Sequence, residues 1–287
     1  MSTDKNLAAL KSGGFMQQRQ PDYFSMRLKV VGGQLSTFQL MMIQRAADRF
    51  GKGYVHLTSR QGVEIPFIHV DDIDAVKEFF AESGVVEVGV CGPRVRTITA
   101  CQGNAICSSG NIDTTALAQK LDARYGGREL PHKFKIGVTG CANNCLKAEE
   151  NDIGIKGGAR PECNLERCIF CGGCAKVCPV GAITVDRSAR SWTIDRDRCI
   201  NCGRCLKRCR TALTGATGYI VYFGGRFGRE IVIGKKSAPL ITDEAELFDV
   251  IDKALENFNA NAKRGERFSA MLARLQPAHE GAQSDPK

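Results

Sequence analysis

The residues whose types and spacing could do chemistry are first of all cysteines, of which the chain has 14. Cys101 and Cys107 have five residues between them, and further on Cys141 and Cys145 have three. Two such pairs, if folding brings them together, supply four thiolates to one centre. Four thiolates suit an iron–sulfur cluster or zinc, so this first cysteine group predicts a metal site and leaves both metals open.

Two further groups repeat one motif, C-x2-C-x2-C-x3-C, with each cysteine 31 residues after its counterpart. The doubled motif is typical of bacterial ferredoxins with two [4Fe-4S] clusters, in which the fourth cysteine of each run binds the other cluster. Zinc sites rarely use it. We therefore predict one cluster on Cys168, Cys171, Cys174 and Cys209, and a second on Cys178, Cys199, Cys202 and Cys205. Cys91 and Cys163 remain, and we expect them to be buried or incidental thiols.

Two lysines stand just before the second cysteine pair. Lys133 and Lys135 alternate with apolar residues in a segment that reads as a strand, so their side chains point to one side. Two lysines on one face repel each other unless an anion lies between them. A half-exposed strand is the alternative interpretation.

Size and composition are ordinary for a globular protein. The chain has 287 residues, of which 43% are hydrophobic, enough for a sizeable core in one or two domains. It shows no apolar signal-peptide segment, and no apolar run approaches the ~20 residues that a membrane span needs. We therefore expect a cytoplasmic protein without a membrane span, whose cysteines bind metals rather than form disulfides.

The formal net charge is +9, but the lysines and arginines are spread along the chain without a long basic run. This distribution argues against nucleic acid as a partner. A solvated basic surface is one alternative. Anionic cofactors and an anionic substrate, which need compensating cations when buried, are another.

Strands and helices must position these residues. Residues 24–31 read as a strand, and a helix capped by Ser36 follows and ends at Gly51. A second strand pair and a second helix complete a small α+β unit of ferredoxin-like type. Beyond it, residues 94–100 read as a strand that enters the first cysteine group, and Asp113 reads as a helix cap.

Several separated motifs together resemble one family. The C-x5-C and C-x3-C pairs, the LTSRQ segment and the lysine–x–lysine pair are similar to motifs of the sirohaem–[4Fe-4S] sulfite and nitrite reductases. Within that family the chain most resembles the sirohaem-binding subunits of anaerobic sulfite reductases. The resemblance covers roughly residues 20–265.

The resemblance implies roles for the first cysteine group. Its members would hold a third [4Fe-4S] cluster, and the last of them would also be the axial ligand of the sirohaem iron: Cys101, Cys107, Cys141 and Cys145. Arg226, after a Gly-Gly pair, either approaches the sirohaem or belongs to a plain hairpin turn.

The resemblance also implies a substrate site. Arg60 of LTSRQ would face the sirohaem and the substrate anion, and Lys133 and Lys135 would bind that anion. Arg96 would be the second substrate arginine, with Arg94 as a weaker candidate for the same role and as a possible sirohaem contact.

The implied fold class is α+β, namely the sirohaem sulfite/nitrite reductase fold with an inserted bacterial-type 2[4Fe-4S] ferredoxin domain. Such insertions are tolerated where the ends of the insert lie close together. The expected divisions are a leader at 1–20, a ferredoxin-like half-domain at 21–85, a sirohaem/[4Fe-4S] domain at 86–160 and 214–275, the ferredoxin domain at 161–213 and a disordered tail at 276–287.

The expected function is the six-electron reduction of sulfite to sulfide, with sirohaem and three [4Fe-4S] clusters as cofactors. Nitrite reduction to ammonia at the same site is an alternative, and an electron-transfer iron–sulfur subunit without active sirohaem is another. The chain has no Gly-rich dinucleotide motif, so we expect a separate ferredoxin or flavoprotein subunit to donate electrons. Many reductases of this family contain two copies of the fold and this chain has one, so we also expect a homodimer or a homologous partner chain.

Overall fold

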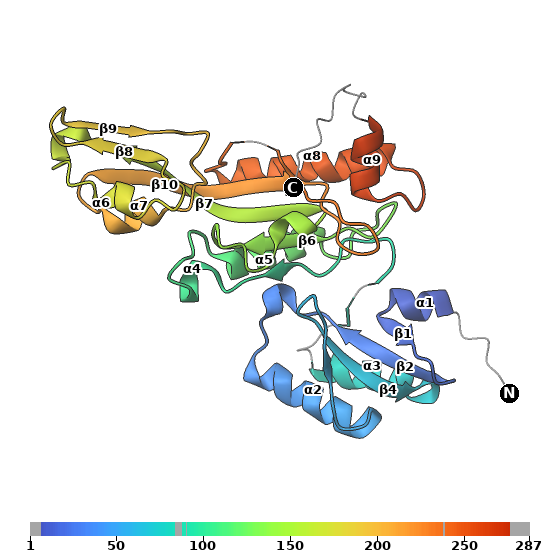
Figure 1. The fold of residues 1–287 in the computed structure, drawn as a ribbon. Helices are drawn as coiled ribbons and strands as arrows, with labels where there is room; N and C mark the ends of the chain where they lie inside the picture. Colours follow the sequence, from blue (N-terminus) through green and yellow to red (C-terminus); the bar gives the residue numbers. More distant parts are fainter. Residues whose placement is uncertain (1–6, 84–87, 90, 238, 276–287) are drawn as a thin grey trace.

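The computed structural model describes residues 7–83, 88–89, 91–237 and 239–275. Figure 1 shows three parts: an N-terminal unit, a central domain from which two long strands project, and a small lobe at the far end of those strands. None of the helices in the described ranges is long and apolar enough to cross a membrane, and a cytoplasmic location stays a prediction.

The N-terminal unit is an antiparallel sheet in the order β1-β2-β4-β3. Met26 of β2 packs in one core with Ile43 of α2 and Phe80 of α3, because alternate residues of β2 face the helices. The elements are α1 (Leu7–Ser12), β1 (Phe15–Gln17), β2 (Tyr23–Leu28), α2 (Thr37–Phe50), β3 (His56–Leu57), β4 (Val63–His69) and α3 (Ile73–Ser83).

Local signals place α2 where the sequence predicts it. The Ser36 hydroxyl accepts a hydrogen bond from the Gln39 N–H at 3.1 Å, and the Gln39 side chain accepts one from the Ser36 N–H at 2.8 Å. The helix ends at Gly51, as predicted. Part of the predicted leader at 1–20 is folded instead: it forms α1 and β1, and Phe15 of β1 is buried in the core of the unit.

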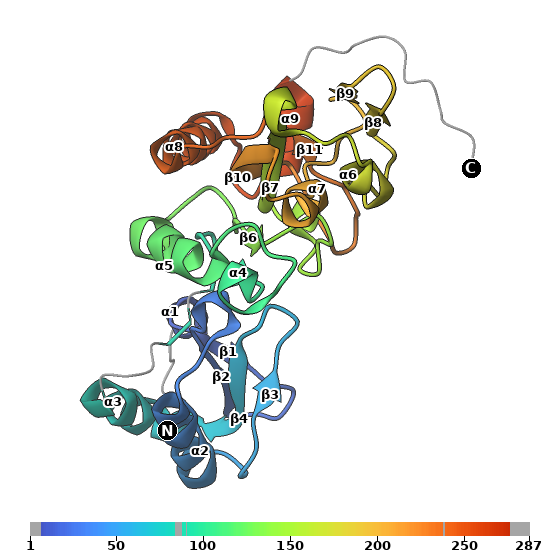
Figure 2. The same cartoon turned by 90° about the vertical axis from the view of Figure 1, so that its left-hand side faces the viewer.

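The central domain contains a five-stranded sheet in the order β11-β10-β7-β6-β5. β5, β6 and β7 run parallel, and β7 and β10 pair antiparallel along their whole length. In both views α4 and α5 lie towards the N-terminal unit, and α8 and α9 lie on the far side of the domain (Figures 1 and 2). The elements are β5 (Thr99–Ala100), α4 (Gly103–Ile106), α5 (Thr114–Tyr125), β6 (Ile136–Thr139), β7 (Ile153–Cys163), β10 (Leu213–Phe223), β11 (Lys235–Lys236), α8 (Glu244–Asn261) and α9 (Phe268–Leu275).

The strand predicted over 94–100 is shorter in the structure, where only β5 is regular. Before β5 the chain makes isolated bridges, such as that between Val95 and Phe134. Asp113 caps α5 as predicted, since its carboxylate accepts from the Ala116 N–H at 3.0 Å.

The lobe repeats its sequence motif in its backbone. Phe170 and Asn201, 31 residues apart, have φ angles of 52° and 53°, and Gly172 and Gly203 both have φ of 72°. The lobe contains α6 (Gly173–Lys176), α7 (Arg204–Arg208) and a hairpin of β8 (Ile183–Asp186) and β9 (Ser191–Ile194). Its two ends meet because the last residue of β7 pairs with the first of β10, as an inserted domain would require, and an inserted ferredoxin domain stays a prediction.

Candidate active site

A cavity of about 300 Å³ lies where the N-terminal unit meets the central domain. All four basic residues predicted to bind substrate line it: Arg60, Arg96, Lys133 and Lys135. They come from the loop after β3 and from the two segments that lead into β5 and β6. The fold therefore gathers on one wall cations that are far apart in the sequence.

The loop after β3 is held against the strand that leads to Cys101. The side-chain amide of Gln61 donates to the Ala100 carbonyl at 2.8 Å and accepts from the Ala100 N–H at 3.0 Å, as a neighbouring strand would. Gln61 belongs to the LTSRQ segment, yet its role in fixing the loop becomes visible only in the tertiary structure. It sets the position of the preceding residue, Arg60.

Arg60 donates two hydrogen bonds within the fold. One guanidinium nitrogen donates to Asn151 Oδ1 at 3.0 Å and the other to the Thr97 carbonyl at 3.1 Å. Burial lowers the pKa of Arg60 to about 10, against the attraction of Asp152. The guanidinium stays charged at neutral pH and is fixed before any ligand binds.

The two lysines carry lowered pKa values. Burial is the main cause for Lys135, and with the neighbouring Arg60 and Arg267 it lowers the Lys135 pKa to about 8. Burial, Arg267 and Arg96 lower the Lys133 pKa in the same way. An anion in the cavity would relieve this repulsion, and Lys135 has a pKa suited to giving up a proton near neutral pH.

A buried carboxylate stands behind the lysines. Asp152 is fully buried, and both of its oxygens lie 3.1 Å from Nη2 of Arg267. Asp152 Oδ2 also accepts from the Lys135 N–H at 2.8 Å. Desolvation raises the Asp152 pKa, and the ion pair with Arg267 opposes that shift. Sequence reasoning missed both residues, since their spacing carries no motif.

Arg27 of β2 is a fifth cation that lines the cavity. Its Nε donates to Glu64 Oε1 at 2.7 Å, and Nη1 donates to Cys91 Sγ at 3.3 Å. Cys91 is buried as expected, but it contacts a cavity residue and is not incidental. The only sequence signal for Arg27 is its place on the polar side of an alternating strand.

Arg94 and Arg226 do not line this cavity. Arg94 pairs with Glu129 at 2.7 Å. Arg226 pairs with Glu230 at 2.6 Å, and its backbone bonds in both directions with Val232, which makes a short hairpin. For Arg226 the geometry favours the plain hairpin turn over the sirohaem contact.

The first cysteine group lies at the carboxyl ends of neighbouring parallel strands. β5 leads into Cys101 and β6 into the segment with Cys141, and Ala100 pairs with Val138. The Cys101 sulfur accepts from the Gly140 N–H at 3.0 Å, which ties the two strand ends together. Cys107 and Cys145 are exposed on the adjoining loops.

Close approach of these loops requires glycine. Gly103 has a φ of 61°, and a β-carbon there would lie 2.5 Å from the Thr114 hydroxyl. Across the described part of the chain, no three cysteine, histidine or acidic side chains converge on a single metal ion. In a [4Fe-4S] cluster each thiolate binds a different iron, so its four ligands need not converge in that way. Four thiolates without an imidazole fit such a cluster.

In the lobe the cysteines group across the repeat. A cavity of about 190 Å³ is lined by Cys168, Cys171, Cys174 and Cys209. A smaller one of about 10 Å³ is lined by Cys178, Cys199, Cys202 and Cys205. These are the two crossed sets that the doubled motif predicts, although the cluster assignments stay predictions. Cys163 lies beside the first set, where burial and Cys168 raise its pKa to about 12.

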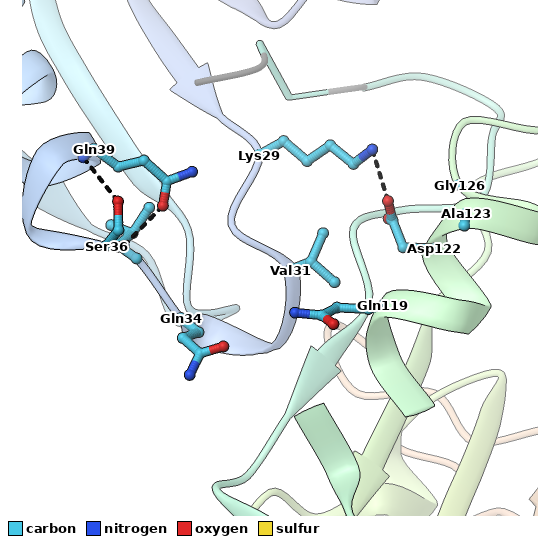
Figure 3. A pocket seen from close by; sticks show the side chains of 10 residues that line it. Lys29, Val31, Gln34, Ser36, Gln39, Gln119, Asp122, Ala123 and Gly126 are labelled. Atoms are coloured by element: carbon cyan, nitrogen blue, oxygen red, sulfur yellow. Dashed lines mark hydrogen bonds and ion pairs between the residues drawn. The ribbon is translucent and has the colours of Figure 1, made fainter. Parts of the chain in front are cut away.

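A larger cavity, of about 820 Å³, contains none of the predicted site residues (Figure 3). It lies between the start of α2 and α5, and its two charged side chains, Lys29 and Asp122, pair at 2.6 Å. These two charges neutralise each other, and the described residues of the lining include no cysteine.

The chain matches the family described as "Nitrite and sulphite reductase 4Fe-4S domain" over residues 91–278. Residues 16–83 match the "Nitrite/Sulfite reductase ferredoxin-like half domain". The chain therefore belongs to the nitrite and sulfite reductase family, and its fold is the α+β fold of that family. Membership of this family supports an iron–sulfur cluster and sirohaem as cofactors, while the number of clusters stays a prediction.

Among curated relatives, the chain is 36% identical over 265 residues to the "Coenzyme F420-dependent sulfite reductase" of Methanocaldococcus jannaschii, covering 92% of this chain and 42% of that one. It is 35% identical over 172 residues to a subunit of the anaerobic sulfite reductase of Salmonella typhimurium, covering 54% of this chain and 50% of that one. The chain thus spans half the length or less of these relatives. A crystal structure of dissimilatory sulfite reductase I shares the fold, with a TM-score of 0.71, 20% identity and coverage of 88% and 67%.

Proposed function

We propose that this chain reduces sulfite to sulfide at a sirohaem coupled to a [4Fe-4S] cluster. The observation that carries the proposal is the cavity in which Arg27, Arg60, Arg96, Lys133 and Lys135 converge. Five cations around one small cavity suit an oxyanion better than any neutral substrate. Two of its curated relatives, one of which matches 265 residues of the chain, are named sulfite reductases or subunits of one.

The cofactors would relay the electrons from a separate donor to the substrate, because no side chain can store the six that sulfite reduction needs. Cys101, Cys107, Cys141 and Cys145 would hold the cluster nearest the substrate, with Cys145 as the ligand shared with sirohaem. The lobe would hold two more clusters on the crossed cysteine sets. Four thiolates at each place fit this assignment.

The residues of the cavity bind and orient the anion. Arginine suits an oxyanion because its planar fork donates two hydrogen bonds, and Arg60 is already fixed by Asn151 and Thr97. Donors fixed in advance in a dry site stabilise developing charge far better than water does. Lys135, with a pKa of about 8, can pass protons to oxygens that leave as water.

Nitrite is the second candidate substrate. It is also a small oxyanion that takes six electrons, and the relatives include an assimilatory ferredoxin-dependent nitrite reductase of Haloferax mediterranei, 30% identical over 169 residues. An electron-transfer subunit without active sirohaem is the third candidate function. It does not explain why five cations line one cavity.

The test is anaerobic purification from a host that makes sirohaem, then an optical spectrum, pigment extraction and an iron count. We expect sirohaem and about 13 irons per chain, four for each of three clusters and one for sirohaem. With reduced methyl viologen, sulfite should yield sulfide faster than nitrite yields ammonia. Only eight irons, about two clusters, and no tetrapyrrole in well-folded protein would contradict the proposal.

A further inference from the structure

The two cysteine sets of the lobe lie at different distances from the central domain. The second set contacts it directly: Asn111 Nδ2 donates to the Cys202 carbonyl at 3.4 Å, and the Ala159 N–H donates to the Asn201 carbonyl at 2.8 Å. Lys207 Nζ adds a bond to the Gly110 carbonyl at 3.2 Å. This loop of the central domain follows Cys107, so the second set adjoins the first cysteine group.

The first set lies further out along β7. Ala159 of β7 bridges to Cys202 of the second set, whereas Cys163, four residues later, lies beside Cys168 of the first. Four residues of strand span about 13 Å. The first set is therefore the outer one of the two, and the second lies between it and the central domain.

The outer set has an apolar centre on its surface. Ile169, between Cys168 and Cys171, lines the cavity of this set and is 79% exposed. Its counterpart in the repeat, Ile200 beside the inner set, is 44% exposed. A single exposed isoleucine is common on protein surfaces, and what distinguishes Ile169 is its place between two cysteines of the outer set.

Cations surround that centre. Arg208 and Arg210 line the same cavity, and Arg167 stands two residues before Ile169; all three are exposed. None of the three pairs with a carboxylate among the residues that the structure describes. Residues 161–213 hold ten basic and five acidic residues, so the lobe as a whole is basic.

We propose that this outer rim, made of Arg167, Ile169, Arg208 and Arg210, is the docking surface for a small acidic electron-transfer protein. The partner would present its redox centre through an apolar patch ringed by carboxylates, and this inference rests on the proposed function. In each encounter the donor loses one electron and the outer cluster gains one, with no bond made or broken. Weak, salt-sensitive docking of this kind is typical of redox encounters.

The test uses the holoenzyme with a reduced, strongly acidic [2Fe-2S] ferredoxin as the probe. Stopped-flow absorbance follows cluster reduction without sulfite, for the wild type and for Arg208→Glu, Arg210→Glu and Ile169→Ser. Arg45→Glu is the matched control, because Arg45 is also exposed but lies on α2 in the N-terminal unit. Unchanged cluster spectra verify that each variant is intact.

We expect each rim substitution by glutamate to slow reduction by the ferredoxin at least about tenfold at low salt and to flatten its salt dependence. Ile169→Ser should slow it with the salt dependence kept. Methyl viologen, which needs no docking surface, should reduce all variants equally. Rim variants as fast as the wild type, or no slower than Arg45→Glu, would overturn the inference. Since sulfite is absent, this readout is independent of the substrate.

Discussion

The cavity gathers positive charge at a cost that the chain offsets in part. Lys135 is half-buried beside Arg60 and Arg267, and its pKa of about 8 records that repulsion. Asp152 supplies one buried negative charge behind the cations. Without a ligand, the positive charges around the cavity exceed the negative ones. An incoming oxyanion would neutralise this excess, so the fold itself favours the binding of anions.

Replacing Lys135 by alanine removes one of these cations. We expect the KM for sulfite to rise and kcat to fall, together lowering kcat/KM by about 10²-fold, while the cluster and sirohaem spectra stay unchanged. Steady-state kinetics with methyl viologen measure the effect. Wild-type kinetics in this variant would remove Lys135 from the substrate site.

The pH profile provides an independent check of the same lysine. Burial and like charges hold its pKa at about 8, so the charged form predominates below that pH and is lost above it. If the charged form binds or protonates the substrate, kcat/KM falls as pH rises through about 8. In Lys135→Arg the guanidinium stays charged, so the descending limb should move to higher pH. A limb at the same pH in both proteins would assign it to another group.

The elements are joined by polar contacts that run through the site. β7 begins just after Asn151 and Asp152; the first of these residues bonds to Arg60 and the second to Arg267, at the start of α9. Asn151 Nδ2 also donates to the Ala148 carbonyl at 3.3 Å, in the turn that follows Cys145. One pair of adjacent residues therefore links the cysteine loop, the N-terminal unit and the C-terminal helix.

Breaking the buried ion pair should destabilise the domain. Arg267→Met leaves the Asp152 carboxylate without its partner, so we expect a loss of about 3–5 kcal/mol in the free energy of unfolding. The matched control is Arg274→Met on α9, whose pair with Glu266 is more exposed, so we expect a much smaller loss. Urea unfolding followed by circular dichroism compares them. Equal effects would show that Arg267 contributes no more than a surface pair.

The half domain matches the chain over residues 16–83 and the 4Fe-4S domain over residues 91–278, once each. Since many reductases of this family contain two copies of the fold, we propose that a second copy of this chain or a homologous partner completes the assembly. The first cysteine group and its exposed members, Cys107 and Cys145, would then face the partner.

Size-exclusion chromatography with light scattering on the holoprotein tests this association. We expect the mass of a dimer or of a complex with a homologous chain, and sulfite turnover in that fraction. A monomer with full activity would contradict the expectation, and it would show that the five cations of one chain are sufficient.

The sequence by itself determined the cysteine groups, the helix caps at Ser36 and Asp113, and the paired lysines at 133 and 135, whereas the roles of Arg60 and Arg96 came only from the motif resemblance. These signals are local: ligand spacing, strand alternation and capping are written within a few residues. The motif resemblance added the family, which the comparisons confirm. The prediction of a leader at 1–20 was wrong for the segment around Phe15, whose side chain is buried in the core of the N-terminal unit. No sequence pattern near Phe15 indicates that burial.

Only the tertiary structure decided what surrounds those residues. Arg27 with Cys91, Arg60 with Asn151 and Asp152 with Arg267 are pairs separated by 64, 91 and 115 residues. No local pattern encodes such pairs, because they form when packing brings distant segments together and buried polar groups must then find partners. The same holds for the order of the two cysteine sets in the lobe, which depends on where β7 meets each of them.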